Sequence, residues 1–181
     1  MSTATLSDIM NINQFPDYDI VYCDPPWEQR MVRFFQTQMK KQTGKTADNE
    51  IGAILAKLAS LCSTEKPVFI EYSVKNCDRV INHMEAAGHK HFKTVNGLQS
   101  NNKPYVIMTF NTSVDIGDGV KGFDAVTKAV KLTGAKTVVD PFAGIGKTAE
   151  AAIKAGATYH GYELNPARYE RLSKVVGSMG R

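Results

Sequence analysis

Residues 138 to 165 read VVDPFAGIGKTAEAAIKAGATYHGYELN, and this stretch decides the fold. A β-branched run ends in Asp140, a turn with two glycines follows, and an Ala-rich helical segment leads to a second apolar run that ends at Glu163. Glycines let the backbone pass close to a ligand and take dihedral angles that other residues resist. This order is typical of an adenosine-containing cofactor site at the carboxyl edge of an open sheet, where a strand is followed by a glycine turn, a helix and a second strand that ends in an acid.

Two other phosphate-binding patterns overlap with this stretch. GIGKT is typical of the end of a P-loop, but Pro141 stands five positions before Gly146, where that motif needs a glycine. We therefore expect Lys147 and Thr148 to be plain helix residues. A dinucleotide site stays an alternative, although Ala149 replaces the third glycine of GxGxxG. A tight strand–helix turn without a ligand is the purely structural alternative.

Outward from this stretch, short apolar runs alternate with helical patterns along the whole chain. Strands are expected at 19–23, 67–72, 89–95, 105–110, 136–139 and 157–162. Helices are expected at 51–62, 77–87, 123–133, 147–155 and from Pro166 onward, with Asn165 as the N-cap of the last helix. This order predicts an α/β sandwich with a mostly parallel sheet, in which 89–95 and 105–110 form a hairpin joined by a polar loop.

Length and composition exclude several classes of protein. The 181 residues, with 43% hydrophobic, 22% charged and 9% aromatic residues, are typical of one globular domain and exclude wholesale disorder and collagen. No apolar run approaches the ~18 residues of a spanning helix, so no membrane partner is expected. The first basic residue is Arg30, so we expect no signal peptide. The three cysteines lack CxxC spacing, which favours a reducing, cytoplasmic compartment and predicts no metal site.

The net charge of +4 is unevenly distributed. Between Glu28 and Thr46 that glutamate is the only acid, and five basic residues accompany it. With interleaved phenylalanine and glutamine, such a segment could hold a phosphate backbone. The alternative is a solvated, partly disordered loop, and we expect a mobile basic loop at 28–48. The candidate nucleic-acid-binding residues are Arg30, Arg33, Lys40, Lys41 and Lys45.

Two motifs of the chain resemble those of a known family. DPFAGIG at 140–146 with GYELNPARY at 161–169 is similar to the S-adenosylmethionine site of amino-methyltransferases that act on nucleic acid bases. Asp24-Pro25-Pro26-Trp27 resembles the catalytic tetrapeptide of the same enzymes, [DNS]PP[YFW]. The tetrapeptide precedes the cofactor motif, as in the circularly permuted β-class DNA adenine-N6 methyltransferases, some of which are phage-encoded.

The resemblance implies a single Rossmann-like methyltransferase domain in permuted order over 1–181, with a catalytic half at 1–111 and a cofactor-binding half at 112–181. It implies S-adenosyl-L-methionine as cofactor and DNA, ahead of RNA, as partner. A homodimer is left open, and a phage-encoded enzyme would act in the host cytoplasm. The implied cofactor-binding residues are Asp140, Pro141, Phe142, Ala143, Gly144, Gly146, Glu163 and Asn165.

The chemistry of the tetrapeptide fits this resemblance. The exocyclic amine of adenine is a poor nucleophile, because its lone pair is delocalised into the ring. Asp24 and the carbonyl of Pro25 can accept its two N–H groups, and Asp24 can stabilise the positive charge that develops on nitrogen. Pro26 stiffens the turn, and Trp27 offers a face for an extruded base, with a core anchor as its structural alternative. Asp rather than Ser at position 24 favours adenine over cytosine N4.

The chain departs from the family in one respect. It has no separate target-recognition region, so recognition is expected from 28–48, from the loop at 96–103 or from a partner. Residues 6–9 are expected to form an edge strand that completes the cofactor pocket, and residues 121–123 to correspond to an extra cofactor contact. RNA adenosine N6-methylation, for which DPPW is also used, and a catalytically silent binding subunit remain as alternatives.

Overall fold

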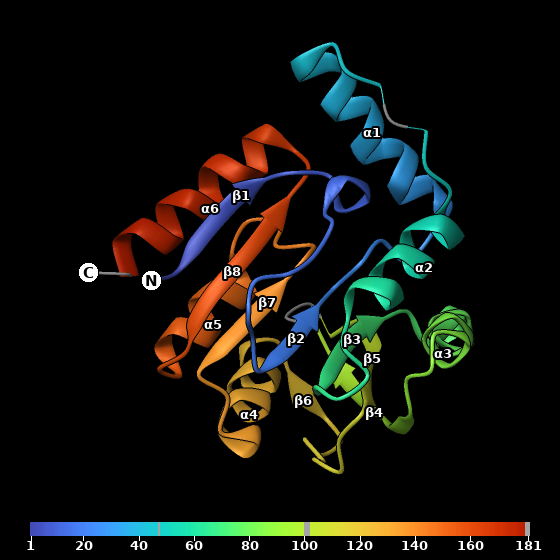
Figure 1. The fold of residues 1–181 in the computed structure, drawn as a ribbon, viewed down its shortest axis with the longest axis vertical. Helices are drawn as coiled ribbons and strands as arrows, with labels where there is room; N and C mark the ends of the chain where they lie inside the picture. Colours follow the sequence, from blue (N-terminus) through green and yellow to red (C-terminus); the bar gives the residue numbers. More distant parts are fainter. Residues whose placement is uncertain (47, 100–101, 180–181) are drawn as a thin grey trace.

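The computed structural model describes residues 1–46, 48–99 and 102–179, which form one eight-stranded sheet and six α-helices (Figure 1). The strands are β1 Thr3–Leu6, β2 Ile20–Cys23, β3 Val68–Tyr72, β4 His91–Leu98, β5 Pro104–Phe110, β6 Val120–Lys121, β7 Thr137–Asp140 and β8 Thr158–Glu163. The helices are α1 Gln29–Thr43, α2 Ile51–Leu61, α3 Cys77–Ala86, α4 Phe123–Thr133, α5 Lys147–Lys154 and α6 Pro166–Met179, with short 3₁₀ turns η1 Ile9–Asn11 and η2 Val74–Asn76.

The strand order is β1-β8-β7-β2-β3-β5-β4-β6. The first five strands in this order, β1, β8, β7, β2 and β3, run parallel to one another. Strand β5 is antiparallel to β3 and β4, and β6 is parallel to β4. The predicted fold class, a single-domain α/β fold with a mostly parallel sheet and an antiparallel hairpin, is therefore confirmed. Strands β7 and β8 lie between β1 and β2, so the two halves of the chain share one sheet (Figure 1).

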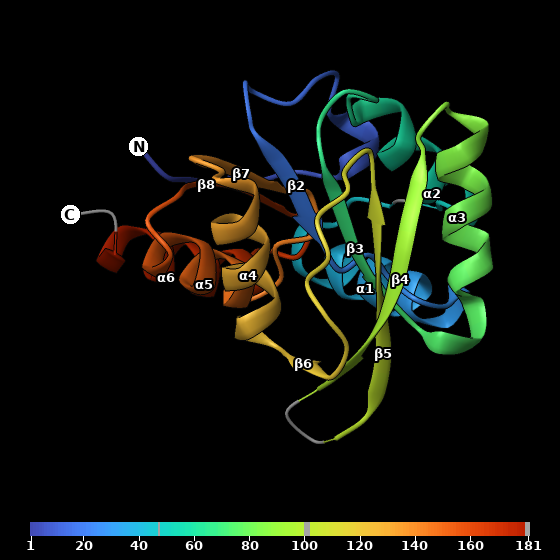
Figure 2. The same ribbon diagram turned by 90° about the horizontal axis from the view of Figure 1, so that it is seen from below.

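Both faces of the sheet are covered. Alternate residues of β2 point to opposite sides, so Tyr22 joins the core beneath α4, α5 and α6, whereas Cys23 joins the core beneath α2 and α3. Figure 2 shows these two helical layers on either side of the strands. Burial on both faces explains the nearly continuous apolar run of β3. Within the described part of the chain, no helix combines the length and apolar character needed to cross a bilayer.

The segment at 28–48 was predicted wrongly as a loop, because Gln29–Thr43 forms α1. Val32, Gln36 and Met39 are buried at i, i+4 and i+7, which is the spacing of one helical face. A glutamine within that stripe and the polar residues around it hid the pattern. Gly44, in a left-handed conformation with φ 73°, ends the helix. Residue 47 lies outside the described residues.

The hairpin loop is shorter than predicted. Strand β4 continues to Leu98, past the Asn96 where a loop was expected to begin. Gly97 pairs with Tyr105, whose ring covers it so closely that a Cβ at position 97 would lie 2.5 Å from the Tyr105 Cζ. Residues 100 and 101 lie outside the described residues, so a recognition loop at 96–103 stays a prediction.

The N-terminal edge strand begins earlier than expected. β1 ends at Leu6 instead of running from residue 6 to 9, and its four residues pair with β8. The Ser7 amide still donates to the Glu163 carbonyl at 3.0 Å. Asp8 then caps η1 by accepting a hydrogen bond from the Met10 amide. The chain thus turns away from the sheet at Asp8, directly beside the end of β8.

Candidate active site

Five neighbouring parallel strands bring acidic side chains to one edge of the sheet. Asp140 and Glu163 are the last residues of β7 and β8, Asp24 directly follows β2, Glu71 lies near the end of β3, and Asp8 follows β1. The carboxyl ends of parallel strands meet at the same edge, and an open sheet binds ligands there, where its strand order reverses. The two strand ends on which the expected chemistry depends, those of β2 and β7, are hydrogen-bonded neighbours.

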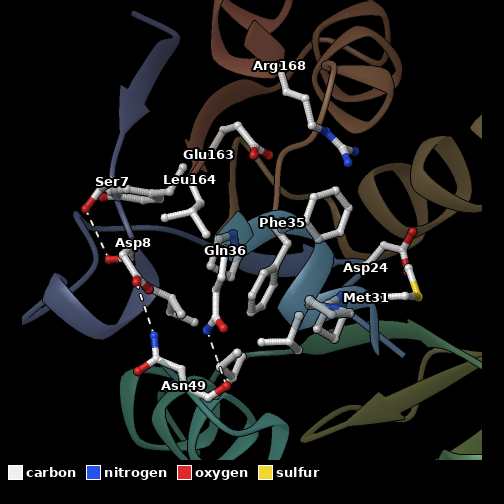
Figure 3. A pocket seen from close by; sticks show the side chains of 18 residues that line it. Ser7, Asp8, Asp24, Met31, Phe35, Gln36, Asn49, Glu163, Leu164 and Arg168 are labelled. Atoms are coloured by element: carbon white, nitrogen blue, oxygen red, sulfur yellow. Dashed lines mark hydrogen bonds between the residues drawn. The ribbon is translucent and has the colours of Figure 1, made fainter. Parts of the chain in front are cut away.

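A cavity of about 160 Å³ opens at this edge, and we call it the Glu163 cavity (Figure 3). The predicted site residues that line it are Asp24, Pro25, Pro26, Pro141, Phe142 and Glu163. Ser7, Asp8 and Ile9, which belong to the segment expected to form an edge strand, also line it, and their place in a cofactor pocket stays a prediction. Trp27, Asp140, Ala143, Gly144, Gly146 and Asn165 are not among the residues that line it.

Several side chains of the Glu163 cavity were missed by the sequence analysis. Asn49 donates to the Asp8 carboxylate at 3.2 Å, and Gln36 donates to the Asn49 carbonyl at 3.3 Å (Figure 3). The Arg168 guanidinium lies over the Phe35 ring, 4.8 Å from its centroid, and its buried Nε has no hydrogen-bond partner among the described residues. Asp8 follows a strand as the other acids do, which is a usable signal, whereas the position of Arg168 depends on how α6 packs.

Asp24 lies between two cavities. Its Oδ1 accepts a hydrogen bond from Trp27 Nε1 at 2.7 Å, while the half-buried Trp27 ring packs against the cores of both faces. The Asp24 side chain is exposed where it lines the two cavities, and partial desolvation by the surrounding protein raises its pKa to about 6. The Trp27 hydrogen bond and the positive charges of Arg168 and Lys147 oppose that rise. Base stacking on Trp27 stays a prediction.

Glu163 is oriented by the beginning of α6. Its Oε1 accepts a hydrogen bond from the Asn165 amide at 2.7 Å. The Asn165 side chain in turn accepts from the Arg168 amide at 3.1 Å, as expected of an N-cap. Burial raises the pKa of Glu163, and the backbone hydrogen bond from Asn165 and the charge of Arg168 partly offset the rise. The carboxyl thus faces the cavity in one orientation.

Asp140 holds the glycine turn and does not line the cavity. Its two oxygens accept from the Phe142 amide at 2.9 Å and the Tyr159 hydroxyl at 3.1 Å. Burial raises its pKa to about 7, although these hydrogen bonds oppose the rise. The Ala143 amide donates to the Tyr162 carbonyl at 2.9 Å, so the turn is anchored to β8 as well. Asp140 therefore acts on the turn that presents Phe142.

The two glycines of the turn have different neighbours. A Cβ at Gly144, where φ is +56°, would lie 2.7 Å from the Nη2 of Arg168. The absence of a side chain at this position therefore leaves space for the guanidinium. A Cβ at Gly146, where φ is +93°, would lie 3.3 Å from side-chain atoms of Leu172 and Val175. Gly146 therefore permits close packing of the turn against α6, where the sequence suggested close approach to a ligand.

A second cavity, of about 400 Å³, lies on the other side of Asp24, and we call it the Glu71 cavity. It is lined by Asp24, Glu71, Gln99, Tyr105, Gly122, Phe123, Val126, Lys147 and Thr148. Lys147 and Thr148, expected to be plain helix residues, begin α5 and border this cavity. Glu71 was missed, although a single charge within the apolar strand sequence VFIEY is a usable signal.

The candidate nucleic-acid-binding residues lie outside both cavities. Four of them are exposed on α1, and the fifth, Lys45, is exposed just after it. Arg30 pairs with Glu28 at 2.6 Å. The opposite face of α1 contributes Val32 and Phe35 to the Glu163 cavity. Among the described residues, no group of His, Cys, Asp and Glu has an arrangement suited to a metal ion.

The comparisons with known proteins identify the fold. No protein-family model and no curated protein sequence matches the chain. The structure of M1.HpyAVI with S-adenosylmethionine is similar with a TM-score of 0.71 at 13% identity, over 97% of this chain and 99% of that one. TTHA0409 of Thermus thermophilus with S-adenosyl-L-methionine gives 0.68 at 12% identity, over 99% and 94%. The cytosine-N4-specific PvuII DNA methyltransferase gives 0.60 at 11% identity, over 98% and 92%.

The raised pKa values predict how stability depends on pH. Asp24, Asp140 and Glu71 have pKa values of about 6, 7 and 8 in the folded protein, whereas unfolded carboxyls titrate near ~4. The folded state therefore binds more protons between these values, so these three groups contribute stability that is fully present at low pH and is lost as the pH rises through 6 to 8. We expect Tm to fall from pH 5 to pH 8 and to fall less in Glu71→Gln. Identical profiles for variant and wild type would contradict this.

The packing role of Gly146 is testable against Gly134, which also has positive φ but has open space around it. Gly134→Ala should cost only backbone strain, about 1–2 kcal/mol of unfolding free energy. Gly146→Ala should cost a further ~1–3 kcal/mol, because the new methyl group presses on α6. Urea denaturation measures both, and equal losses would show that the crowding at α6 has no energetic effect.

Proposed function

We propose that this protein transfers a methyl group from S-adenosyl-L-methionine to the N6 amine of adenine in DNA. The observation that carries the proposal is the position of Asp24. It borders both the Glu163 cavity, which has the features of a nucleoside site, and the Glu71 cavity on its other side. A carboxylate between two cavities can contact a group held in one while a second molecule occupies the other. The DPPW motif precedes the DPFAGIG motif in the chain, and this order supports the part of the proposal that places the protein in the permuted β-class.

The residues of the Glu163 cavity fit the cofactor. The Glu163 carboxylate can accept hydrogen bonds from a ribose diol, Asp8 can accept from an amino group, and Phe142 offers an apolar wall. The buried, unpartnered Nε of Arg168 calls for an acceptor, which the carboxylate end of an amino acid provides. When bound, S-adenosylmethionine supplies an electrophilic methyl group on a sulfonium sulfur. Two similar structures, those of M1.HpyAVI and TTHA0409, contain this compound.

The chain itself contributes positioning and electrostatics. The Asp24 carboxylate accepts a hydrogen bond from the exocyclic amine and stabilises positive charge that develops on its nitrogen. Trp27 keeps one carboxylate oxygen in place through the hydrogen bond at 2.7 Å, so the other oxygen remains for the amine. Pro25 and Pro26 restrict the turn that carries both groups. The barrier is lowered mainly because the amine is held in a defined orientation and shielded from water.

Cytosine N4 is the second candidate target, and the PvuII enzyme among the similar structures favours it. Adenine and cytosine both present an exocyclic amine beside a ring nitrogen. Expression of the protein in a methylation-deficient bacterium, followed by mass spectrometry of its genomic DNA, separates the two. N6-methyladenine is the expected product. N4-methylcytosine would show that cytosine is the target base, and unmodified DNA with methylated RNA would show that RNA is the substrate.

Asp24→Ala is the decisive substitution for the chemistry. It removes both the hydrogen-bond acceptor and the charge, so methyl transfer should fall by at least ~100-fold. In the wild type, kcat/KM should rise from pH 5 to pH 7, because only the ionised form of Asp24, with a pKa of about 6, accepts and stabilises the amine. Tritium transfer measures activity and calorimetry measures cofactor Kd, which should change little. Full activity in the variant would remove Asp24 from the mechanism.

The exposed basic face of α1 is proposed to hold the DNA backbone. Replacing Lys40, Lys41 and Lys45 by Ala should weaken binding of any duplex, and the slope of log K against log salt should fall in magnitude by about three. The control replaces three exposed lysines elsewhere, Lys131, Lys136 and Lys174. Fluorescence anisotropy over a salt series compares the two triple variants. Equal effects of the two triple variants would show that DNA binds a diffuse positive surface, with no specific contact to α1.

A further inference from the structure

Asp24 and Glu71 are neighbours across two parallel strands. Strands β2 and β3 pair with Cys23 opposite Ile70, so the next residues along, Asp24 and Glu71, lie side by side, with Cα atoms about 5 Å apart. Alternation along the strands puts both on the face that carries Tyr22, the face covered by α4 and α5. Both residues line the Glu71 cavity. Two carboxyl groups therefore reach this cavity from adjacent strands.

One oxygen of Glu71 is held and the other is available. The buried Tyr22 hydroxyl donates to Glu71 Oε1 at 2.7 Å. Within the described ranges, Oε2 has no hydrogen-bond partner of its own. This asymmetry fixes the plane of the carboxyl group and leaves Oε2 as the atom that can meet a ligand.

A second polar group in the same cavity also lacks a partner. The Tyr105 side chain is 1% exposed and lines the cavity, and its hydroxyl makes no hydrogen bond within the described part of the chain. Burial and the charges of Glu71 and Asp24 raise the pKa of Tyr105, and the Gly122 backbone only partly opposes the rise, so the hydroxyl stays protonated. A buried hydroxyl without a partner costs free energy unless a ligand or water satisfies it. The cavity is therefore built for a polar ligand.

The two carboxyls differ in protonation at neutral pH. Burial and the adjacent charge of Asp24 raise the pKa of Glu71 to about 8, whereas that of Asp24 is about 6. Glu71 thus keeps its proton when Asp24 is ionised, which makes the pair one donor beside one acceptor. The titratable groups that act on Glu71, or on which Glu71 acts, are Tyr22, Cys23, Asp24, Tyr105, Asp140 and Lys147. Gly122, Phe123 and Val126, which α4 and its N-cap place in the cavity, carry no charge.

We propose that Glu71 is a base-reading residue, whose carboxyl O–H donates to the ring nitrogen beside the exocyclic amine that Asp24 accepts. This inference rests on the proposed function and specifies how its target is recognised. One donor beside one acceptor matches the edge –N=C–NH₂, which adenine presents as N1 and N6 and cytosine as N3 and N4. Thymine presents a carbonyl and a ring N–H, the reverse pattern, and is rejected. The cavity of about 400 Å³ lies in the usual size range of small-molecule sites, ~300–1,000 Å³.

The test pairs a side-chain change with a change of one substrate atom. The substrates are a duplex that carries the adenine identified in the genomic experiment and a matched duplex with 1-deazaadenine there, which keeps the amine but lacks the ring acceptor. Wild-type kcat/KM should fall by about tenfold or more on the deaza duplex, and Glu71→Ala should show a similar loss on adenine. On the deaza duplex, Glu71→Ala should lose little more, because the contact is already absent. Glu65→Gln, exposed just before the same strand, serves as the control and should leave both substrates unchanged.

The pH profile gives a second readout. Wild-type kcat/KM should fall above about pH 8, where Glu71 ionises and can no longer donate. Glu71→Gln retains a donor and an acceptor at every pH, so it should stay active and lose the alkaline fall. Its cofactor Kd, measured by calorimetry, should equal that of the wild type.

The outcomes separate this inference from the proposed function. A deaza penalty of the same size in Glu71→Ala as in the wild type would overturn the role of Glu71 while the methyl transfer stands. A clearly weaker cofactor Kd in Glu71→Ala would also overturn it, because Glu71 would then face the amino group of the cofactor. No transfer to any base by the wild type would overturn both proposals.

Discussion

Five parallel strands ending at one edge of the sheet are the constraint on which the site depends. Each of β1, β8, β7, β2 and β3 brings one acidic residue to that edge, in the order Asp8, Glu163, Asp140, Asp24 and Glu71. The acids are far apart along the chain, and only the strand order places them together. Because neighbouring strands are about 4.8 Å apart, the carboxyls of adjacent strands interact electrostatically and cannot all ionise at neutral pH.

The raised pKa values at this edge show that ionised carboxyls there reduce the stability of the fold. An ionised carboxyl loses hydration when protein surrounds it, and the same loss of water strengthens its interaction with a developing positive charge. Arg168 and Lys147 face the acids from α6 and α5 without forming ion pairs within the described residues, so they moderate the negative potential and leave the carboxyls available. Groups kept apart in this way can still pair with a ligand.

Helix α1 connects the proposed chemistry to the proposed nucleic-acid contact. It begins two residues after Trp27, so the tetrapeptide and the basic helix are one continuous segment. Its buried face contributes Phe35 to the Glu163 cavity, where the ring meets Arg168, while Phe34 beside it is 58% exposed among the basic residues. A small shift of α1 on contact with the proposed phosphate backbone would therefore change the wall of the Glu163 cavity as well.

The local sequence determined most of the elements and the turn chemistry. Local propensities and periodicity account for the strand that ends in Asp140, the N-cap at Asn165 and the α/β alternation. It failed for α1, because a buried glutamine interrupts the apolar stripe, and it assigned Gly146 to ligand approach because a sequence does not show what packs against a glycine. The tertiary structure alone decided that Glu71 stands beside Asp24, since register between strands separated by more than forty residues is set by the packing of both sheet faces. Local motifs thus identify which groups carry chemistry, whereas long-range strand pairing decides which of them act together.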